Sequence, residues 1–138
     1  MERENVQQVV DQINAYLQTH LWFDFEVMEY VGYRYVVMGG IDPSVPPDLE
    51  IYFDRVAFVS MPIEWMTDTS KPPLTLVTGD ALRHLNRKFQ VQEGHQIFKF
   101  SPEGFPDDFG CYVCAQEISF KIMTGEGSEV AEAQPPTP

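Results

Sequence analysis

The chain carries little positive charge. Lys and Arg together number 9 against 21 Asp and Glu, which gives a net charge of −12 over 138 residues. Binding to nucleic acid needs an excess of cations over phosphates, and anionic membrane surfaces attract basic segments, so we expect neither as a partner. The same acidity favours solubility and is compatible with electrostatic steering toward a basic partner.

Long hydrophobic runs are missing as well. No stretch approaches the roughly 18 consecutive apolar residues that a membrane-spanning helix needs. The first five residues, Met1 to Asn5, are polar and acidic and do not resemble a signal peptide, so we expect a cytoplasmic location. The composition is 43% hydrophobic and 13% aromatic, which is too apolar for a disordered chain, and the length fits one domain.

Cysteine is scarce, and its two residues, Cys111 and Cys114, form a C-x-x-C pattern. Redox pairs of this spacing begin a helix, whereas here the motif opens a predicted strand over 111–123, which puts the two sulfurs on opposite faces. A structural zinc site needs four ligands, and a second cysteine pair is lacking. We therefore interpret both residues as packing cysteines and expect no metal. On the predicted strand, one face carries Tyr112, Cys114, Ile118, Phe120 and Ile122.

Recognisable catalytic motifs are lacking too. The chain contains no G-x-S-x-G, no G-x-x-x-x-G-K-[ST], no G-x-G-x-x-G and no H-E-x-x-H. The adjacent carboxylates Asp107 and Asp108 lie in a Gly/Pro-rich loop near Glu103, where a solvated turn explains them better than a catalytic pair. We assign no catalytic residue and no cofactor, and we favour a protein that is not an enzyme.

Hydrophobic periodicity predicts a mixed α+β domain over residues 1–124. Residues 3–20 and about 80–89 are typical of amphipathic helices, and the proline- and glycine-rich segments 39–48, 62–73 and 101–110 of loops. Strands are expected at 25–38 (one strand, or a hairpin at Gly32), 49–61, 74–77, 97–100 and 111–123. We expect a mainly antiparallel sheet of about five to six strands with both helices on one face. Residues 125–138 are predicted to be a flexible acidic, Pro-rich tail.

Positive charge concentrates at one place in the sequence, the exposed side of the second predicted helix, at Arg83, His84, Arg87 and Lys88. One interpretation is a docking spot for an anionic ligand or an acidic segment. The other, which we favour, is that cations near a helix C-terminus complement the helix dipole.

Aromatic residues in the predicted loops suggest a contact surface. Trp65 lies in the loop 62–73, while Phe105 and Phe109 flank Asp107 and Asp108 in the loop 101–110. If these aromatic side chains gather at the surface, they form the apolar centre of a binding patch rimmed by acid. If their loops fold back over the ends of the sheet, the same side chains belong to the core. Together with the acidity and small size, such a patch favours a non-catalytic protein-binding module: an accessory, adaptor or immunity-type protein with a basic protein as its partner. These five residues are the predicted contact surface.

Two other hypotheses stay open. A small-molecule-binding domain or small enzyme would have a pocket between helix 3–20 and the sheet, with His84 or His95 as its titrating group. A structural subunit of a homo-oligomer would associate through edge strands rich in Val, Tyr and Ile.

Overall fold

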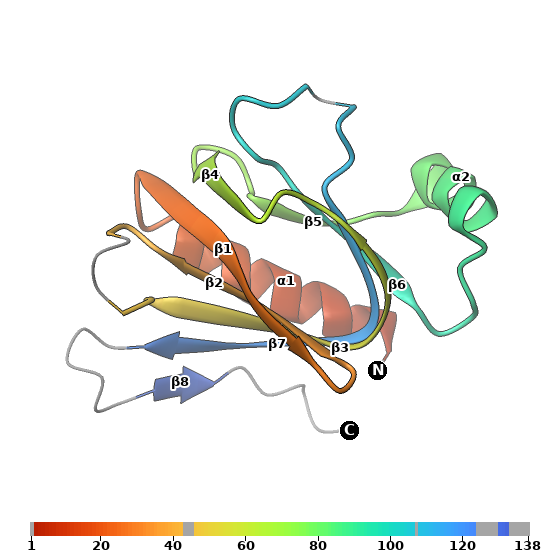
Figure 1. Ribbon diagram of the computed structural model, residues 1–138, viewed down its shortest axis with the longest axis horizontal. Coiled ribbons are helices and arrows are strands. Elements are labelled where there is room, and N and C mark those ends of the chain that lie inside the picture. Colours follow the sequence, from red (N-terminus) through yellow and green to blue (C-terminus); the bar gives the residue numbers. More distant parts are fainter. Residues whose placement is uncertain (1, 43–45, 107, 124–129, 133–138) are drawn as a thin grey trace.

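The computed structural model describes residues 2–42, 46–106, 108–123 and 130–132, and shows an antiparallel sheet with two helices (Figure 1). The helices are α1 (Arg3–Leu17) and α2 (Gly79–Phe89). The strands are β1 (Trp22–Val31), β2 (Arg34–Gly40), β3 (Leu49–Ser60), β4 (Glu64–Asp68), β5 (Leu74–Leu76), β6 (Gln96–Phe100), β7 (Tyr112–Met123) and β8 (Val130–Glu132). In the part of the chain that is described, no helix is long and apolar enough to cross a membrane.

The predicted α+β class is confirmed, with more strands than expected. Neighbouring strands follow the order β4-β1-β2-β3-β7-β6-β5, and β8 pairs with β7. The segment 25–38 is a hairpin, because Gly32 has a φ of 64° at its turn, a conformation that glycine adopts without steric cost. The segment 62–73, expected to be a loop, contains β4. Its buried Trp65 and Thr67 alternate with the exposed Glu64, Met66 and Asp68, the period-two pattern of a half-buried strand.

The helix α1 packs on one face of the sheet, behind it in Figure 1. We call this the inner face and the opposite one the outer face. Its stripe of Val6, Val9, Val10, Ile13 and Leu17 is buried throughout, as the 3.6-residue period predicts. These side chains share the main core with the aromatic side chains of Phe23, Phe25, Phe53, Phe98 and Phe100. Each such ring buries a large apolar area and contributes strongly to the hydrophobic stabilisation of the core.

The sheet curls where β3 and β7, which pair with each other, both reverse the alternation of their side chains between the two faces. In β3 the core residues Leu49, Ile51 and Phe53 are followed by Arg55, whose φ is 58°, and the register shifts between Val56 and Phe58. In the sequence too, the apolar alternation of this segment changes phase after Arg55, and the structure makes the change by a distortion within one strand rather than by a turn. Val56 packs on the main core and Phe58 on a second cluster at the opposite face.

The predicted face assignment of β7 is therefore wrong in its first half. Cys111, Val113 and Ala115 join Ile118 and Phe120 in the main core, while Tyr112 and Cys114 belong to the second cluster. A uniform alternation cannot anticipate a kink that the partner strand imposes.

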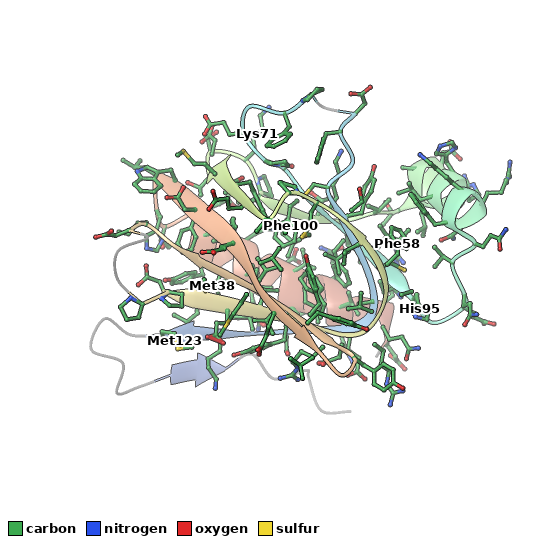
Figure 2. All side chains as sticks on the ribbon, in the orientation of Figure 1. Met38, Phe58, Lys71, His95, Phe100 and Met123 are labelled. Carbon is green, nitrogen blue, oxygen red and sulfur yellow. The ribbon has the colours of Figure 1, made fainter. Side chains whose placement is uncertain are left out.

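The second cluster is where α2 packs, so the two helices do not share a face as expected. Leu85 of α2 belongs to the second cluster, together with Cys114 of β7 and Ile97 of β6. Along these strands Cys114 and Ile97 alternate with main-core residues, so the second cluster lies on the opposite face of the sheet. Phe58 stacks on Phe89 with ring centroids 4.3 Å apart, and both Phe58 and His95 are labelled at this end of the molecule in Figure 2. Hence α2 covers the outer face at one end, and no helix among the described residues covers the rest of that face.

Part of the predicted tail lies in the sheet. Residues 130–132 form β8, which pairs antiparallel with Lys121–Met123. Backbone pairing to an open strand edge needs no apolar side chain, so composition could not predict it. The rest of the predicted tail, 125–129 and 133–138, lies outside the described residues.

Candidate functional site

An open groove of about 380 Å³ lies on the outer face of the sheet, across β4, β1 and β2. The side chains that line it are Asp24 and Glu26 of β1, Met38 of β2, and Glu64 and Met66 of β4. They alternate with Phe25, Trp65 and Gly39, which contribute to the groove but belong to the buried side of the same strands. The segment that follows β2 supplies the rim, through Asp42 and Pro47.

The groove is acidic because strand pairing places carboxylates together. Glu26 lies directly opposite Glu64, and Asp24 lies opposite Met66. With Asp42 the lining holds four carboxylates, and no Lys, Arg or His is among the lining residues that the structure describes. Like charges directly opposite one another in a sheet are destabilising, so this arrangement has a cost in the isolated protein.

Elsewhere on the outer face, two directly opposed residues on neighbouring strands carry opposite charges. Arg34 of β2 lies opposite Asp54 of β3, and its guanidinium donates two hydrogen bonds to that carboxylate, at 2.8 and 3.0 Å. The fold therefore accommodates a cross-strand ion pair on this face, which makes the unmatched pair of Glu26 and Glu64 informative.

The negative charge of the groove affects the pKa of Asp24. Partial burial raises the pKa of this carboxyl above its usual value, and the negative charge of Glu64 raises it further. Both causes disfavour the ionised form, and a cation from outside would reverse the second. The methionine side chains beside the carboxylates offer polarisable apolar surface for the alkyl stem of a Lys or Arg.

The floor of the groove rests on tightly packed aromatic rings. Trp65 stacks on Phe25 at 5.4 Å between centroids and meets Phe100 edge to face at 5.2 Å. Gly39 is required here, since a Cβ at this position would lie within 2.9 Å of the Phe23 and Phe25 rings. Close packing of these rings therefore holds the floor of the groove in one conformation.

The predicted contact residues do not form one surface. Trp65 is 5% exposed and belongs to the core, contributing to the groove floor instead of projecting from a loop. Phe105 and Phe109 are 38% and 40% exposed, with ring centroids 4.6 Å apart, and Asp108 is exposed beside them. Asp107 lies outside the described residues. The loop 101–110 reaches the groove side of the molecule, since the Glu103 N–H donates to the Met66 carbonyl at 2.8 Å.

The basic residues of α2 form no closed site. Arg83, His84, Arg87 and Lys88 are all exposed. Arg83 is bonded to Asp80 on its own helix, and the Lys88 ammonium lies 5.3 Å from the Phe89 ring centroid. Arg87 and Lys88 occupy the last turn, where they complement the helix dipole. An anion-docking role for the four residues stays a prediction.

The two cysteines lie in separate hydrophobic clusters on opposite faces of the sheet. Burial raises the pKa of Cys111 to about 12 and that of Cys114 to about 11. Reactive thiols need the opposite shift. Within the described residues, His, Cys, Asp and Glu form no group of three or more that could hold a metal ion.

The helix–sheet interface, where the alternative hypothesis places a pocket, is filled by the core side chains of α1. His95 lies at the α2 end of the molecule, away from Met38 in the groove (Figure 2), and its Nδ1 is buried without a hydrogen-bond partner among the described residues. His84 is exposed on α2, and neither histidine lines the groove.

Comparison with protein-family models, with curated proteins and with solved structures finds no match. The function must therefore be argued from the residues of this chain. Asp24, Glu26 and Glu64 were not among the predicted site residues. The segment carrying Glu64 was interpreted as a loop, so its pairing with β1 was not expected. The alternation of Glu64, Met66 and Asp68 with Trp65 and Thr67 was the signal that could have placed it in the sheet.

Proposed function

We propose that this protein is a non-catalytic binding module whose groove on β4, β1 and β2 docks a basic partner protein. The observation that carries the proposal is the juxtaposition of Glu26 and Glu64, with Asp24 beside them, in an open groove whose described lining includes no cation. Sheet positions that place like charges together lower stability, and such a cost is commonly retained where a partner relieves it.

The net charge supports the same partner class. A molecule of net charge −12 attracts a basic protein at long range. The carboxylates of the groove would then bind that protein at one defined place on the surface. The partner's Lys or Arg side chains would place their charges among the carboxylates and their stems against Met38 and Met66. Rim charges of this kind act mainly on the association rate and on its salt dependence.

The first experiment is native mass spectrometry of the untagged protein, purified gently from its own source at low salt. A stoichiometric basic protein supports the proposal, and a small bound organic mass would contradict it in favour of a small-molecule site. Affinity for the identified partner is then measured for the Glu26→Lys, Glu64→Lys double variant. We expect it to weaken at least about tenfold, which corresponds to about 1.4 kcal/mol.

The matched control is the double variant Asp11→Lys, Glu93→Lys. It changes the net charge equally, but both of its residues are exposed outside the groove, on α1 and on the segment between α2 and β6. The control should keep its affinity within about threefold, since only the long-range attraction is altered. Equal losses in the two variants would show that net charge alone, and not the groove, determines binding.

Phe105 and Phe109 are proposed as a second, apolar part of the contact. Their rings are partly exposed, and their loop is hydrogen-bonded to β4 beside the groove. The double variant Phe105→Ser, Phe109→Ser tests this part separately from the carboxylates. An unchanged affinity for the partner would remove the two residues from the contact surface.

A further inference from the structure

The second half of β1 has an open edge. The strand β4 pairs with β1 only over Trp22–Glu26, and the last backbone bond on that side joins the Val27 N–H to the Ile63 carbonyl at 2.7 Å. From residue 28 to residue 31, β1 is paired with β2 alone among the described strands. In an antiparallel pair, alternate residues direct their N–H and C=O groups away from the partner strand, so this edge can pair with a further strand.

The open edge carries an unusual concentration of exposed apolar side chains. Five lie on the β1–β2 hairpin and at the entry to β4, with exposed fractions from 46% to 73%: Met28, Tyr30, Val31, Tyr33 and Ile63. In Figure 1 the turn of this hairpin lies at the lower rim of the molecule, at the end of β1 away from β4. Exposed apolar clusters of this kind mark interaction sites.

The two faces of the edge differ in chemistry. Glu26 pairs with Met38 and Glu29 with Val36, two residues apart on β2, so both carboxylates lie on the outer face that holds the groove. The register shift between Val27 and Glu29 makes this possible. Tyr30 pairs with the core residue Tyr35, with ring centroids 6.4 Å apart, and so lies on the inner face.

We infer that an extended segment of the basic partner adds to the sheet at the open edge of β1, with Lys or Arg on its outer face and apolar residues on its inner face. The inference rests on the proposed function and specifies how the groove is approached. Strand addition combines main-chain hydrogen bonds with side chains that alternate between the two faces. A cation on the outer face would lie beside Glu29, next along the sheet from the Glu26 and Glu64 pair, and the apolar positions beside Tyr30.

Charge decides against a second copy of this chain as the occupant. Two copies each carry a net charge of −12, and edge-to-edge pairing over residues 28–31 would bring the Glu29 carboxylate of each copy close to the acidic edge of the other. Like charges opposed across paired strands are destabilising. A basic segment reverses the sign of this interaction.

The probe is a capped nine-residue peptide that alternates Lys and Val, titrated calorimetrically at low salt. One comparison peptide has the same composition with the lysines in one block, and another is N-methylated at every second residue on one edge. We expect the alternating peptide to bind at least about tenfold tighter than either. Hydrogen–deuterium exchange should show new protection of the amides in residues 28–31. Glu29→Lys should weaken binding, whereas the exposed control Glu93→Lys should not.

Equal binding of the alternating and block peptides, without protection at 28–31, would overturn the edge inference and leave the groove proposal standing. The same holds if no peptide binds while the partner still depends on Glu26 and Glu64. Failure of the groove proposal shows separately, as a partner affinity that does not respond to those two residues. A mass that doubles with concentration, together with protection of residues 28–31 in the free protein, would place a second copy at the edge and overturn the inference.

Discussion

At the scale of single residues, Asn14 joins α1 to β5. Its Nδ2 donates to the Leu74 carbonyl at 2.7 Å, and its Oδ1 accepts from the Leu74 N–H at 3.0 Å. One buried amide thereby bonds to both the N–H and the C=O of Leu74 in the short edge strand β5, as a neighbouring strand would do.

Replacing Asn14 with Ala should lower the free energy of unfolding by about 2 kcal/mol, because each buried backbone group left without a partner costs about 1–3 kcal/mol. Chemical denaturation followed by tryptophan fluorescence measures the change. Gln12→Ala, on the exposed side of the same helix, is the control and should stay within about 0.5 kcal/mol of the parent. A similar small change in both variants would show that β5 finds other partners.

The two thiols should be inert in the folded protein. With pKa values raised by burial to about 12 and about 11, Cys111 and Cys114 stay protonated at pH 8, and only the thiolate attacks a disulfide reagent. Release of the chromophore from an aromatic disulfide reagent should be negligible for the native protein and reach two equivalents in guanidinium chloride. Rapid native reaction of one thiol would contradict the packing interpretation.

At the scale of elements, pairing of β1 with β4 brings together charges that are far apart in the sequence. Glu26 and Glu64 oppose each other in this register, while Arg34 and Asp54 across β2 and β3 attract. The contrast predicts that the groove lowers stability and at the same time provides binding.

Glu64→Gln should therefore raise the free energy of unfolding by about 0.5 kcal/mol, since cross-strand pairs contribute about 0.2–1 kcal/mol. It should also weaken binding of the basic partner. Removing the Glu64 charge lowers the pKa of Asp24 toward its usual value, which a carboxyl titration by NMR would record. Loss of stability without loss of binding would mean that Glu64 supports the fold rather than a partner.

At the scale of the whole molecule, the net charge of −12 works against the compact state. Screening becomes effective near 0.1 M salt, where the Debye length is about 10 Å. Going from low salt to moderate sodium chloride should raise the melting temperature by roughly 4 °C, corresponding to about 1 kcal/mol. Binding of the basic partner should weaken over the same range.

The double variant Asp11→Asn, Glu93→Gln removes two charges outside the groove and should show a smaller response of melting temperature to salt. A melting temperature that is independent of salt would indicate that self-repulsion is negligible at this charge density.

Local pattern was sufficient for much of the fold. The stripe from Val6 to Leu17 predicted α1, because a 3.6-residue period is visible without knowing what the helix packs on. The opposite faces of Cys111 and Cys114 follow from strand geometry alone.

Local sequence pattern could not predict the candidate site. Trp65 was expected at the surface since its short strand looks like a loop until β1 pairs with it. The joint change of face in β3 and β7 depends on Arg55 and on the partner strand.

By itself, the sequence determined the helices, most strands, the acidity and the opposite faces of the two cysteines, all of which depend on neighbouring residues or on composition. The tertiary structure alone decided that Glu26 lies opposite Glu64, that Glu103 of the 101–110 loop bonds to β4 at Met66, and that no described strand pairs with residues 28–31 on the side of β4. Register and strand order are set by contacts between distant segments, and these contacts assemble the groove.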